Sequence, residues 1–176
     1  MRCSPLFIAA CAALTLSACA KRPAPDTVAG PVASPGGAQA PAAPAPITPS
    51  PQTASLQDAL AAQAGDRVYF GFDSYEISGE AMSTLQAQAA WLARNPQVRV
   101  LIAGNCDERG AREYNLALGA RRASAVRDSL VRLGVAPARM QTVSYGKERP
   151  IDAGSGEDAW SRNRNGHTIV LDLGPR

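Results

Sequence analysis

The segment 104–123, GNCDERGAREYNLALGARRA, carries most of the information about the fold of this chain. An alternating apolar run precedes it and predicts a strand that ends at Gly104. The apolar residues after Gly119 recur every three or four positions, which predicts a main helix that Gly119 caps and Gly134 ends. A shorter helical piece is expected before Gly119, so the region is interpreted as strand, loop and two-piece helix.

Charged residues lie on both sides of this loop. Asp107 follows the carboxyl end of the strand, where α/β folds tend to hold ligands. Arg121 and Arg122 are expected in the first turn of the main helix, where a cation opposes the helix dipole at a cost of roughly a few tenths of a kcal/mol. The pattern suggests that an anion docks there and that Asp107 and an arginine together hold a zwitterion. A plain ion pair between Asp107 and Arg122 explains the spacing equally well.

The elements on either side of this segment complete an α/β sandwich. Residues 56–64 predict a short leading helix, and residues 78–95 predict a helix with apolar residues on one face. Strands are expected at 67–70, 98–104, 140–144 and 168–173, with a polar, glycine-containing loop between the last two. The order β-α-β-α-β-β predicts one mixed sheet with helices packed on one face.

The chain has 176 residues, and its proline content divides it unevenly. Nine of its 14 prolines lie between Pro23 and Pro51, in a stretch with few charges that cannot build a packed core. We therefore interpret residues 19–55 as a disordered tether, with a reach of roughly 100 Å when extended. Residues 56–176 form one domain, and no apolar run after residue 20 approaches the roughly 20 residues that a membrane span needs.

The charge of the domain argues against nucleic acid as a partner. Residues 56–176 hold 15 basic and 14 acidic residues, whereas domains that neutralise phosphates usually carry a basic excess. Fourteen of those 15 cations are arginines, whose forked guanidinium suits the recognition of carboxylates.

The N-terminus predicts a lipoprotein. Residues 1–18 have the basic start and the short apolar stretch of a secretory signal peptide. They end in Leu16-Ser17-Ala18 before Cys19, which matches the bacterial lipobox, so Cys19 is expected to carry a diacylglycerol and an N-acyl chain. Such an anchor is effectively permanent. Ala20, in place of an aspartate, favours the outer membrane, with the domain in the periplasm.

The remaining cysteine and the histidine do not indicate catalysis or a metal. Processing removes Cys3 and Cys11 and lipidation uses Cys19, which leaves Cys106 without a disulfide partner. We interpret Cys106 as a small apolar filler, with a nucleophilic or metal-binding role as the alternative. His167 is the only histidine, and no Cys and His residues have metal-ligand spacing. No cofactor is expected other than the lipid.

Two spaced motifs resemble the OmpA C-terminal-like peptidoglycan-binding family. They are Gly-x-x-Asp-x-x-Gly from Gly104 and Asn-x-x-Leu-Gly-x-x-Arg-Ala from Asn115. The fuller pattern, which adds FGFD at 70–73, SYGKERP at 144–150 and NRN at 163–165, is closer still to the peptidoglycan-associated lipoproteins of the Tol system. The resemblance covers about 68–170, and the leader, lipobox and tether agree with it.

The resemblance implies that the domain binds the meso-diaminopimelate of peptidoglycan stem peptides and so tethers the outer membrane to the cell wall, with a role in envelope integrity and constriction during division. The aspartate that contacts the amino group falls on Asp107, and the arginine that contacts the carboxylate falls on Arg122. Further residues match positions that line or support the pocket: Phe72, Asp73, Asn115, Leu118 and Arg164. The periplasmic β-propeller protein of the Tol system is an implied partner, and OmpA-type porins are possible ones.

The sequence departs from the family pattern at three places. Asn105-Cys106 precedes the aspartate, Gly119 stands where many OmpA domains have serine, and Gly166-His167 follows the NRN motif. The last departure puts the start of the final strand in doubt. Two other functions are alternatives: a peptidoglycan-processing enzyme, whose catalytic groups the sequence does not supply, and a wall-anchoring OmpA-like module outside the Tol system.

Overall fold

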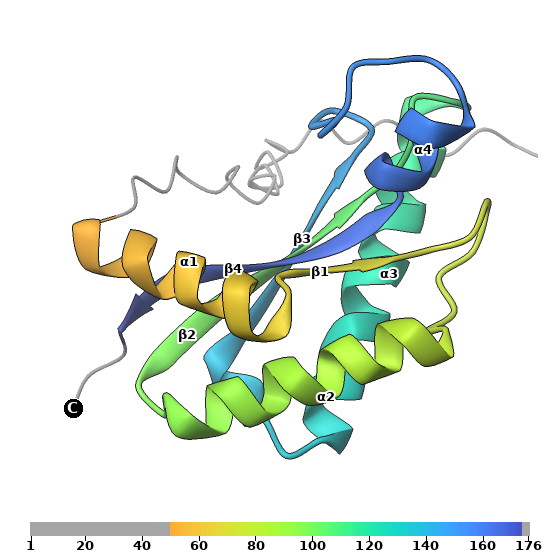
Figure 1. Cartoon of the computed structure of the whole chain (residues 1–176). Helices are drawn as coiled ribbons and strands as arrows, with labels where there is room; N and C mark the ends of the chain where they lie inside the picture. Colours follow the sequence, from red (N-terminus) through yellow and green to blue (C-terminus); the bar gives the residue numbers. More distant parts are fainter. Residues whose placement is uncertain (1–49, 174–176) are drawn as a thin grey trace, which may run out of the picture. The chain divides into compact units, whose positions relative to one another are not determined.

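The computed structural model describes residues 50–173, which form the mixed α/β arrangement drawn in Figure 1. One sheet has the strand order β1-β4-β2-β3, and its strands are β1 (Arg67–Tyr69), β2 (Val98–Asn105), β3 (Met140–Gly146) and β4 (Asn165–Leu173). β2 and β3 are parallel, whereas β4 runs antiparallel to both β1 and β2. The predicted fold class is confirmed. The signal peptide, Cys19 and the tether up to residue 49 lie outside the described residues.

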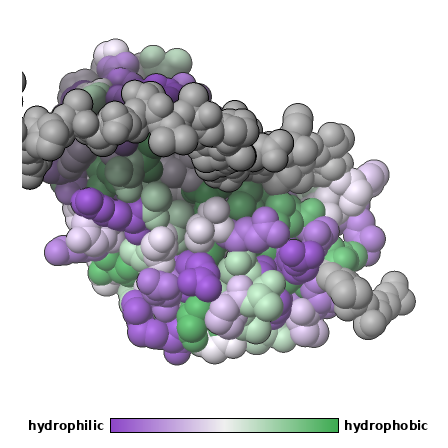
Figure 2. Space-filling model, turned by 180° about the vertical axis from the view of Figure 1, so that it is seen from behind, coloured by the Kyte–Doolittle hydropathy of each residue, from purple (hydrophilic) through white to green (hydrophobic). Residues whose placement is uncertain are grey.

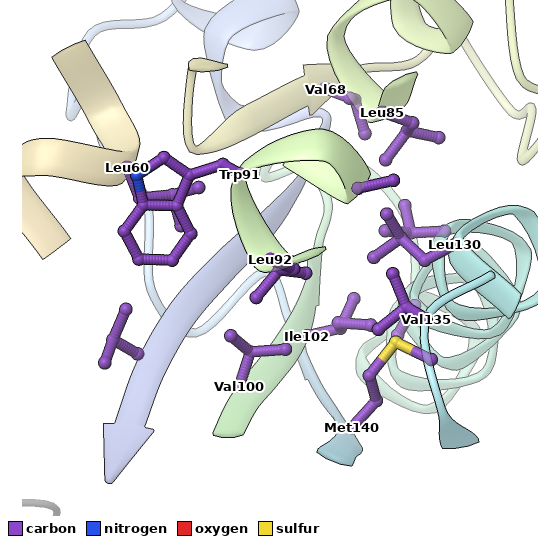
Figure 3. Packing of buried hydrophobic residues seen from close by; sticks show 14 of the residues in the cluster. Leu60, Val68, Leu85, Trp91, Leu92, Val100, Ile102, Leu130, Val135 and Met140 are labelled. Carbon is purple, nitrogen blue, oxygen red and sulfur yellow. The ribbon is translucent and has the colours of Figure 1, made fainter. Parts of the chain in front are cut away.

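Three helices supply apolar side chains to one core. They are α1 (Pro51–Ala64), α2 (Gly79–Arg94) and α3 (Arg112–Arg132), and a short helix α4 (Glu157–Asn163) and a 3₁₀ turn (Pro137–Arg139) complete the elements. Figure 3 shows Val100 and Ile102 of β2 facing Leu92 of α2 and Leu130 of α3. All four side chains are fully buried, and each burial of this size contributes about 1.5–3 kcal/mol.

Helix α1 begins earlier than the sequence predicts. Ser50 caps it by accepting a hydrogen bond from the Thr53 amide at 3.2 Å, and Pro51 occupies the first turn, where its missing N–H costs nothing. Residues 51–55, assigned to the tether, are therefore helical. Gln57 explains the position of α1: its side chain accepts from the Val170 amide at 2.8 Å. The helix thus covers the edge of β4 that the short strand β1 leaves open.

Helix α3 is continuous, and the predicted break at Gly119 is wrong. Gly119 lies in the middle of α3, where the helix crosses β2 at very close range. A Cβ at Gly104 would lie 1.8 Å from the Gly119 carbonyl oxygen, and one at Gly119 would lie 2.8 Å from the Gly104 oxygen. The glycine is therefore required by packing between helix and strand, a contact that helix-capping rules do not consider. Gly134 ends the helix as predicted, with a φ of +94°.

The region between β3 and β4 contains a helix that the sequence analysis missed. α4 has only seven residues, too few to show a clear helical period, and the segment was expected to be a loop. The start of β4, which the departure at Gly166-His167 had put in doubt, is regular: Gly166 pairs with Val68 and with Gly104. A Cβ at Gly166 would lie 2.8 Å from the Val126 side chain, so glycine fits under α3.

Figure 2 shows the side of the molecule turned away in Figure 1, where hydrophobic residues are interspersed with hydrophilic ones over the uncovered area. Scattered apolar residues of this kind are normal on a protein surface. Among residues 50–173, no helix has both the length and the apolar character required to span a membrane.

Candidate peptide-stem binding site

A cavity of about 180 Å³ opens at the carboxyl end of β2. By volume it holds about six waters, which suits one amino-acid side chain with a polar head. All seven binding residues expected from the sequence line it: Phe72, Asp73, Asp107, Asn115, Leu118, Arg122 and Arg164. Four further residues, Cys106, Arg109, Gly110 and Tyr114, complete the lining. The structure therefore brings together residues that span 93 positions of the chain, from 72 to 164.

Asp107 lies in the loop between β2 and α3, and it is 5% exposed. Its carboxylate accepts hydrogen bonds from the Arg109 side chain, at 3.2 Å to one oxygen and 2.6 Å to the other, and from Arg164 at 3.3 Å. Burial by itself raises the pKa of this carboxyl, but the hydrogen bonds from Arg109 and Arg164 outweigh it and bring the pKa below its ordinary value. Asp107 is therefore ionised at neutral pH. It forms no ion pair with Arg122, so the plain-pair interpretation is wrong.

Arg122 is a fully buried cation. It lies in the third turn of α3, so the argument that placed it in a first turn against the helix dipole is wrong. Its guanidinium donates to three backbone carbonyls: Ser74 at 2.8 Å, Asn105 at 2.8 Å and Gly71 at 3.1 Å. These bonds join the loop after β1 to the end of β2. Burial lowers the pKa of Arg122, and within residues 50–173 no carboxylate forms a salt bridge with it.

Arg164 links three parts of the site. Its side chain donates to the Phe70 carbonyl at 3.1 Å, to Asp107, and to Glu157 of α4. The residue is 6% exposed and directly precedes β4. Because its side chain donates both to the Phe70 carbonyl and to Asp107, Arg164 holds the Asp107 loop against the loop after β1.

The loop after β1 contributes Phe72 and Asp73 to the wall of the cavity. Phe72 is 67% exposed, and its ring lies 4.4 Å from the guanidinium of Arg109. Asp73, with a φ of +51°, accepts a hydrogen bond from the Tyr114 hydroxyl of α3. That bond raises the pKa of Tyr114, so the phenol stays protonated and holds the wall in place.

Asn115 and Leu118 belong to the first two turns of α3 and are both buried. The Asn115 amide donates to the carbonyls of Arg109 at 2.6 Å and Ala111 at 3.1 Å, so it shapes the loop that carries Asp107. Cys106 is buried beneath this loop, and its thiol donates to the Asn115 carbonyl at 3.4 Å. Burial raises the pKa of Cys106, which keeps the thiol protonated and agrees with its interpretation as a filler.

Sequence reasoning missed Arg109 and Trp160. Arg109 lies two positions after Asp107 inside the Gly-x-x-Asp-x-x-Gly motif, so its closeness to Asp107 could have been predicted from the sequence. Its guanidinium is held between two rings, 4.4 Å from Phe72 and 4.0 Å from Trp160. Trp160 comes from α4, and the sequence carries no signal that brings α4 to this loop.

Asp66, Arg67 and His167 form a network apart from the cavity. His167 of β4 lies 3.0 Å from the Asp66 carboxylate, which also binds Arg67. Burial raises the pKa of Asp66, but the bonds from His167 and Arg67 lower it overall. In the described part of the chain, no three His, Cys, Asp or Glu side chains lie close enough to hold a metal ion.

The fold agrees with the comparisons with known proteins. The model of the OmpA family matches residues 69–164, more than half of the chain. Over 172 residues the chain is 44% identical to the peptidoglycan-associated lipoprotein of Rhizobium meliloti, a match that covers 97% of this chain and 90% of the relative. The chain therefore belongs to the OmpA family, among its peptidoglycan-associated lipoproteins.

Solved structures give the same result. The crystal structure of the peptidoglycan-associated lipoprotein from Burkholderia pseudomallei is 48% identical, with a TM-score of 0.58, and the match covers 60% of this chain and 89% of that one. The C-terminal domain of Helicobacter pylori MotB has a TM-score of 0.57, covers 61% of this chain and 84% of its own, and is 22% identical. At that identity the second likeness concerns the fold alone.

Proposed function

We propose that this protein is an outer-membrane lipoprotein that binds peptidoglycan without a covalent bond, through the meso-diaminopimelate of the stem peptide. The observation that carries the proposal is Arg122, a buried cation with no salt-bridge partner among residues 50–173, in the wall of an open cavity. A guanidinium has more N–H groups than its three carbonyl partners use. A ligand carboxylate would use the remaining donors and neutralise the charge.

The charges of the cavity lining support a zwitterionic ligand. Three arginines and two aspartates line it, so the formal balance is 3 − 2 = +1. The far end of diaminopimelate carries one ammonium and one carboxylate, and its carbon chain suits the apolar wall that Leu118 and Phe72 provide. In this arrangement Arg122 binds the carboxylate and Asp107 binds the ammonium.

The proposal is tested by co-sedimentation of the purified domain with sacculi. Walls that contain diaminopimelate should bind, whereas walls with lysine at that position, which lacks the terminal carboxylate, should bind at least about tenfold more weakly. Asp107→Asn should reduce binding to the first kind of wall by about 10-fold or more. Arg112→Gln is the matched control, because Arg112 pairs with Glu148 at the surface and does not line the cavity. Equal binding to both walls would contradict the proposal.

The same geometry favours binding over catalysis. A peptidoglycan hydrolase that uses a general acid needs a carboxyl with a raised pKa, whereas the pKa of Asp107 is lowered. The Cys106 thiol, with its raised pKa, is unsuited to act as a nucleophile. A cell-wall zymogram should show no clearing, and clearing that depends on a cavity residue would support the enzyme alternative.

The membrane anchor and the protein partner are parts of the same proposal. Leu16-Ser17-Ala18-Cys19 supports acylation of Cys19 at the outer membrane. Mass spectrometry should find a mature chain that begins at acylated Cys19, and Cys19→Ser should leave an unprocessed precursor or a chain without membrane attachment.

The periplasmic β-propeller protein of the Tol system is the proposed partner, on family resemblance, with a role in constriction during division. Co-purification from cross-linked cells tests it.

A further inference from the structure

The Asp107 carboxylate is already saturated with hydrogen bonds. One oxygen accepts from the Arg109 amide and from its Nε, both at 3.2 Å. The other accepts from the Arg109 Nη2 at 2.6 Å and from the Arg164 Nη1 at 3.3 Å. A carboxylate offers about four acceptor positions, so a ligand ammonium gains full access to Asp107 only when one of these donors leaves.

Arg109 and Arg164 differ in the contacts that each makes besides its bond to Asp107. Arg164 also binds Phe70 and Glu157, and its side chain is 7% exposed. The side chain of Arg109 is 33% exposed, and among the described residues its guanidinium donates only to Asp107. Arg109 is therefore the donor that can leave.

The rings of Phe72 and Trp160 flank the guanidinium of Arg109 in the position in which it binds Asp107. The ring centres lie 4.4 Å and 4.0 Å from the guanidinium. A cation keeps its attraction to an aromatic face when its ion pair is broken. If Arg109 releases Asp107, the same two rings can therefore keep its guanidinium at the edge of the cavity.

We propose that Arg109 is an internal competitor for the ammonium position: it neutralises Asp107 in the empty cavity and exchanges with the ammonium of the ligand. Arg109 is thus a specificity-determining residue of the site, because a ligand without a free ammonium cannot replace it. This inference rests on the proposed function, since it assumes that a ligand ammonium binds at Asp107.

The test compares two soluble ligands by isothermal titration: a disaccharide-tetrapeptide that contains meso-diaminopimelate, and the same compound with its free side-chain amine acetylated. Arg109→Gln removes the competing charge but keeps a polar side chain of similar length. Its affinity for the free-amine ligand should rise by about fivefold, the upper end of the value of a partly exposed ion pair. Its affinity for the acetylated ligand should stay unchanged.

Three comparisons keep the result interpretable. Arg112→Gln, the surface control, should bind both ligands as the wild type does. If Arg109→Gln loses affinity, Arg109 contacts the ligand directly and the competitor role is wrong. If the affinity is unchanged and the Tm is lower, Arg109 is a structural residue, and this result also contradicts the competitor role. Asp107→Asn separates the two proposals: if it binds like the wild type, the proposed function itself fails. If it loses binding while Arg109→Gln gains none, only the competitor role fails.

Discussion

Arg122 has a structural role in addition to its proposed binding role. Its guanidinium ties the carbonyls of Gly71, Ser74 and Asn105 together, so it connects two loops that form the cavity wall. It is fully buried, and a buried group with three hydrogen bonds cannot be removed without a loss of stability.

Arg122→Ala should therefore destabilise the fold as well as abolish binding. Three carbonyls lose their partner, and we expect a loss of at least about 3 kcal/mol, or roughly 10 °C in Tm. Thermal unfolding followed by circular dichroism measures it. Arg121→Ala is the matched control, because the Arg121 guanidinium lies 5.8 Å from the centre of the exposed Tyr75 ring and forms no salt bridge among residues 50–173. A Tm within two or so degrees of the wild type would contradict the structural role.

Asp107 should make stability depend on pH in a defined direction. Its pKa in the folded state lies below the ordinary value of 3.8, so the unfolded chain binds the proton more tightly. The stabilisation is therefore complete above the ordinary value and is lost as the pH falls through the lowered pKa. The difference in unfolding free energy between wild type and Asp107→Asn should be constant from about pH 5 to 8 and should shrink below about pH 4. A difference that grows on acidification would contradict this assignment.

At the scale of the element, the crossing of α3 over β2 depends on two glycines. A side chain at Gly104 would meet the backbone of Gly119 at 1.8 Å, and backbone cannot move aside as a flexible side chain can. The crossing places Leu118 and Arg122 of α3 against the end of β2, where Asp107 follows. The close contact therefore contributes to the geometry of the site.

Gly104→Ala should separate α3 from β2 and cost about 3 kcal/mol or more, in the upper range of single substitutions. Denaturant unfolding measures the loss. Gly79→Ala is the matched control, because nothing lies within 4 Å of its Cβ position at the start of α2, and it should be neutral or slightly stabilising. Equal effects of the two substitutions would show that the crossing is not tight.

Helix α1 gives a second test at this scale. A chain that starts at Ser50 keeps the N-cap and the buried Thr53, whereas one that starts at Leu56 loses both. Loss of an N-cap costs about 1 kcal/mol, so the shorter chain should unfold about 3–6 °C lower. A chain that starts at Ala20 is the reference, and it should match the chain from Ser50. If the chain from Leu56 unfolded at the reference temperature, the first turn of α1 would not contribute to the fold.

At the scale of the whole molecule, the predicted tether must end before residue 50, because residues 51–55 belong to α1. The proline-rich residues 20–49 would reach roughly 90 Å if they were fully extended. With the proposed lipid on Cys19, that reach would set how far from the membrane the cavity can lie.

Deletion of residues 20–49 should leave sacculus binding by the purified domain unchanged, because the deleted residues precede Ser50, the cap of the first described helix. In cells, the deletion should strongly reduce cross-linking of the anchored protein to the wall, since reach is lost. A glycine- and serine-rich replacement of equal length should restore it. Undiminished cross-linking by the deletion would show that the distance between membrane and wall does not limit binding.

The sequence was sufficient to predict the elements with clear periodicity and the residues inside one local motif. The strand β2, the helix α2 and the end of α3 at Gly134 follow from side-chain spacing and from glycine geometry, which act over a few residues. The seven expected site residues follow from the resemblance, and the structure places all of them around one cavity. The seven-residue helix α4 was missed because it is too short to show a period.

Only the tertiary structure decided how those residues interact. It buries Arg122 against three carbonyls, pairs Asp107 with Arg109 and Arg164, and brings Trp160 over the same loop. These contacts depend on how α3 crosses β2 and on where α4 packs, and no local pattern encodes a distance between segments far apart in the chain. The sequence by itself therefore determined which groups are present at the site, and the packing of the elements determined which of these groups pair with one another.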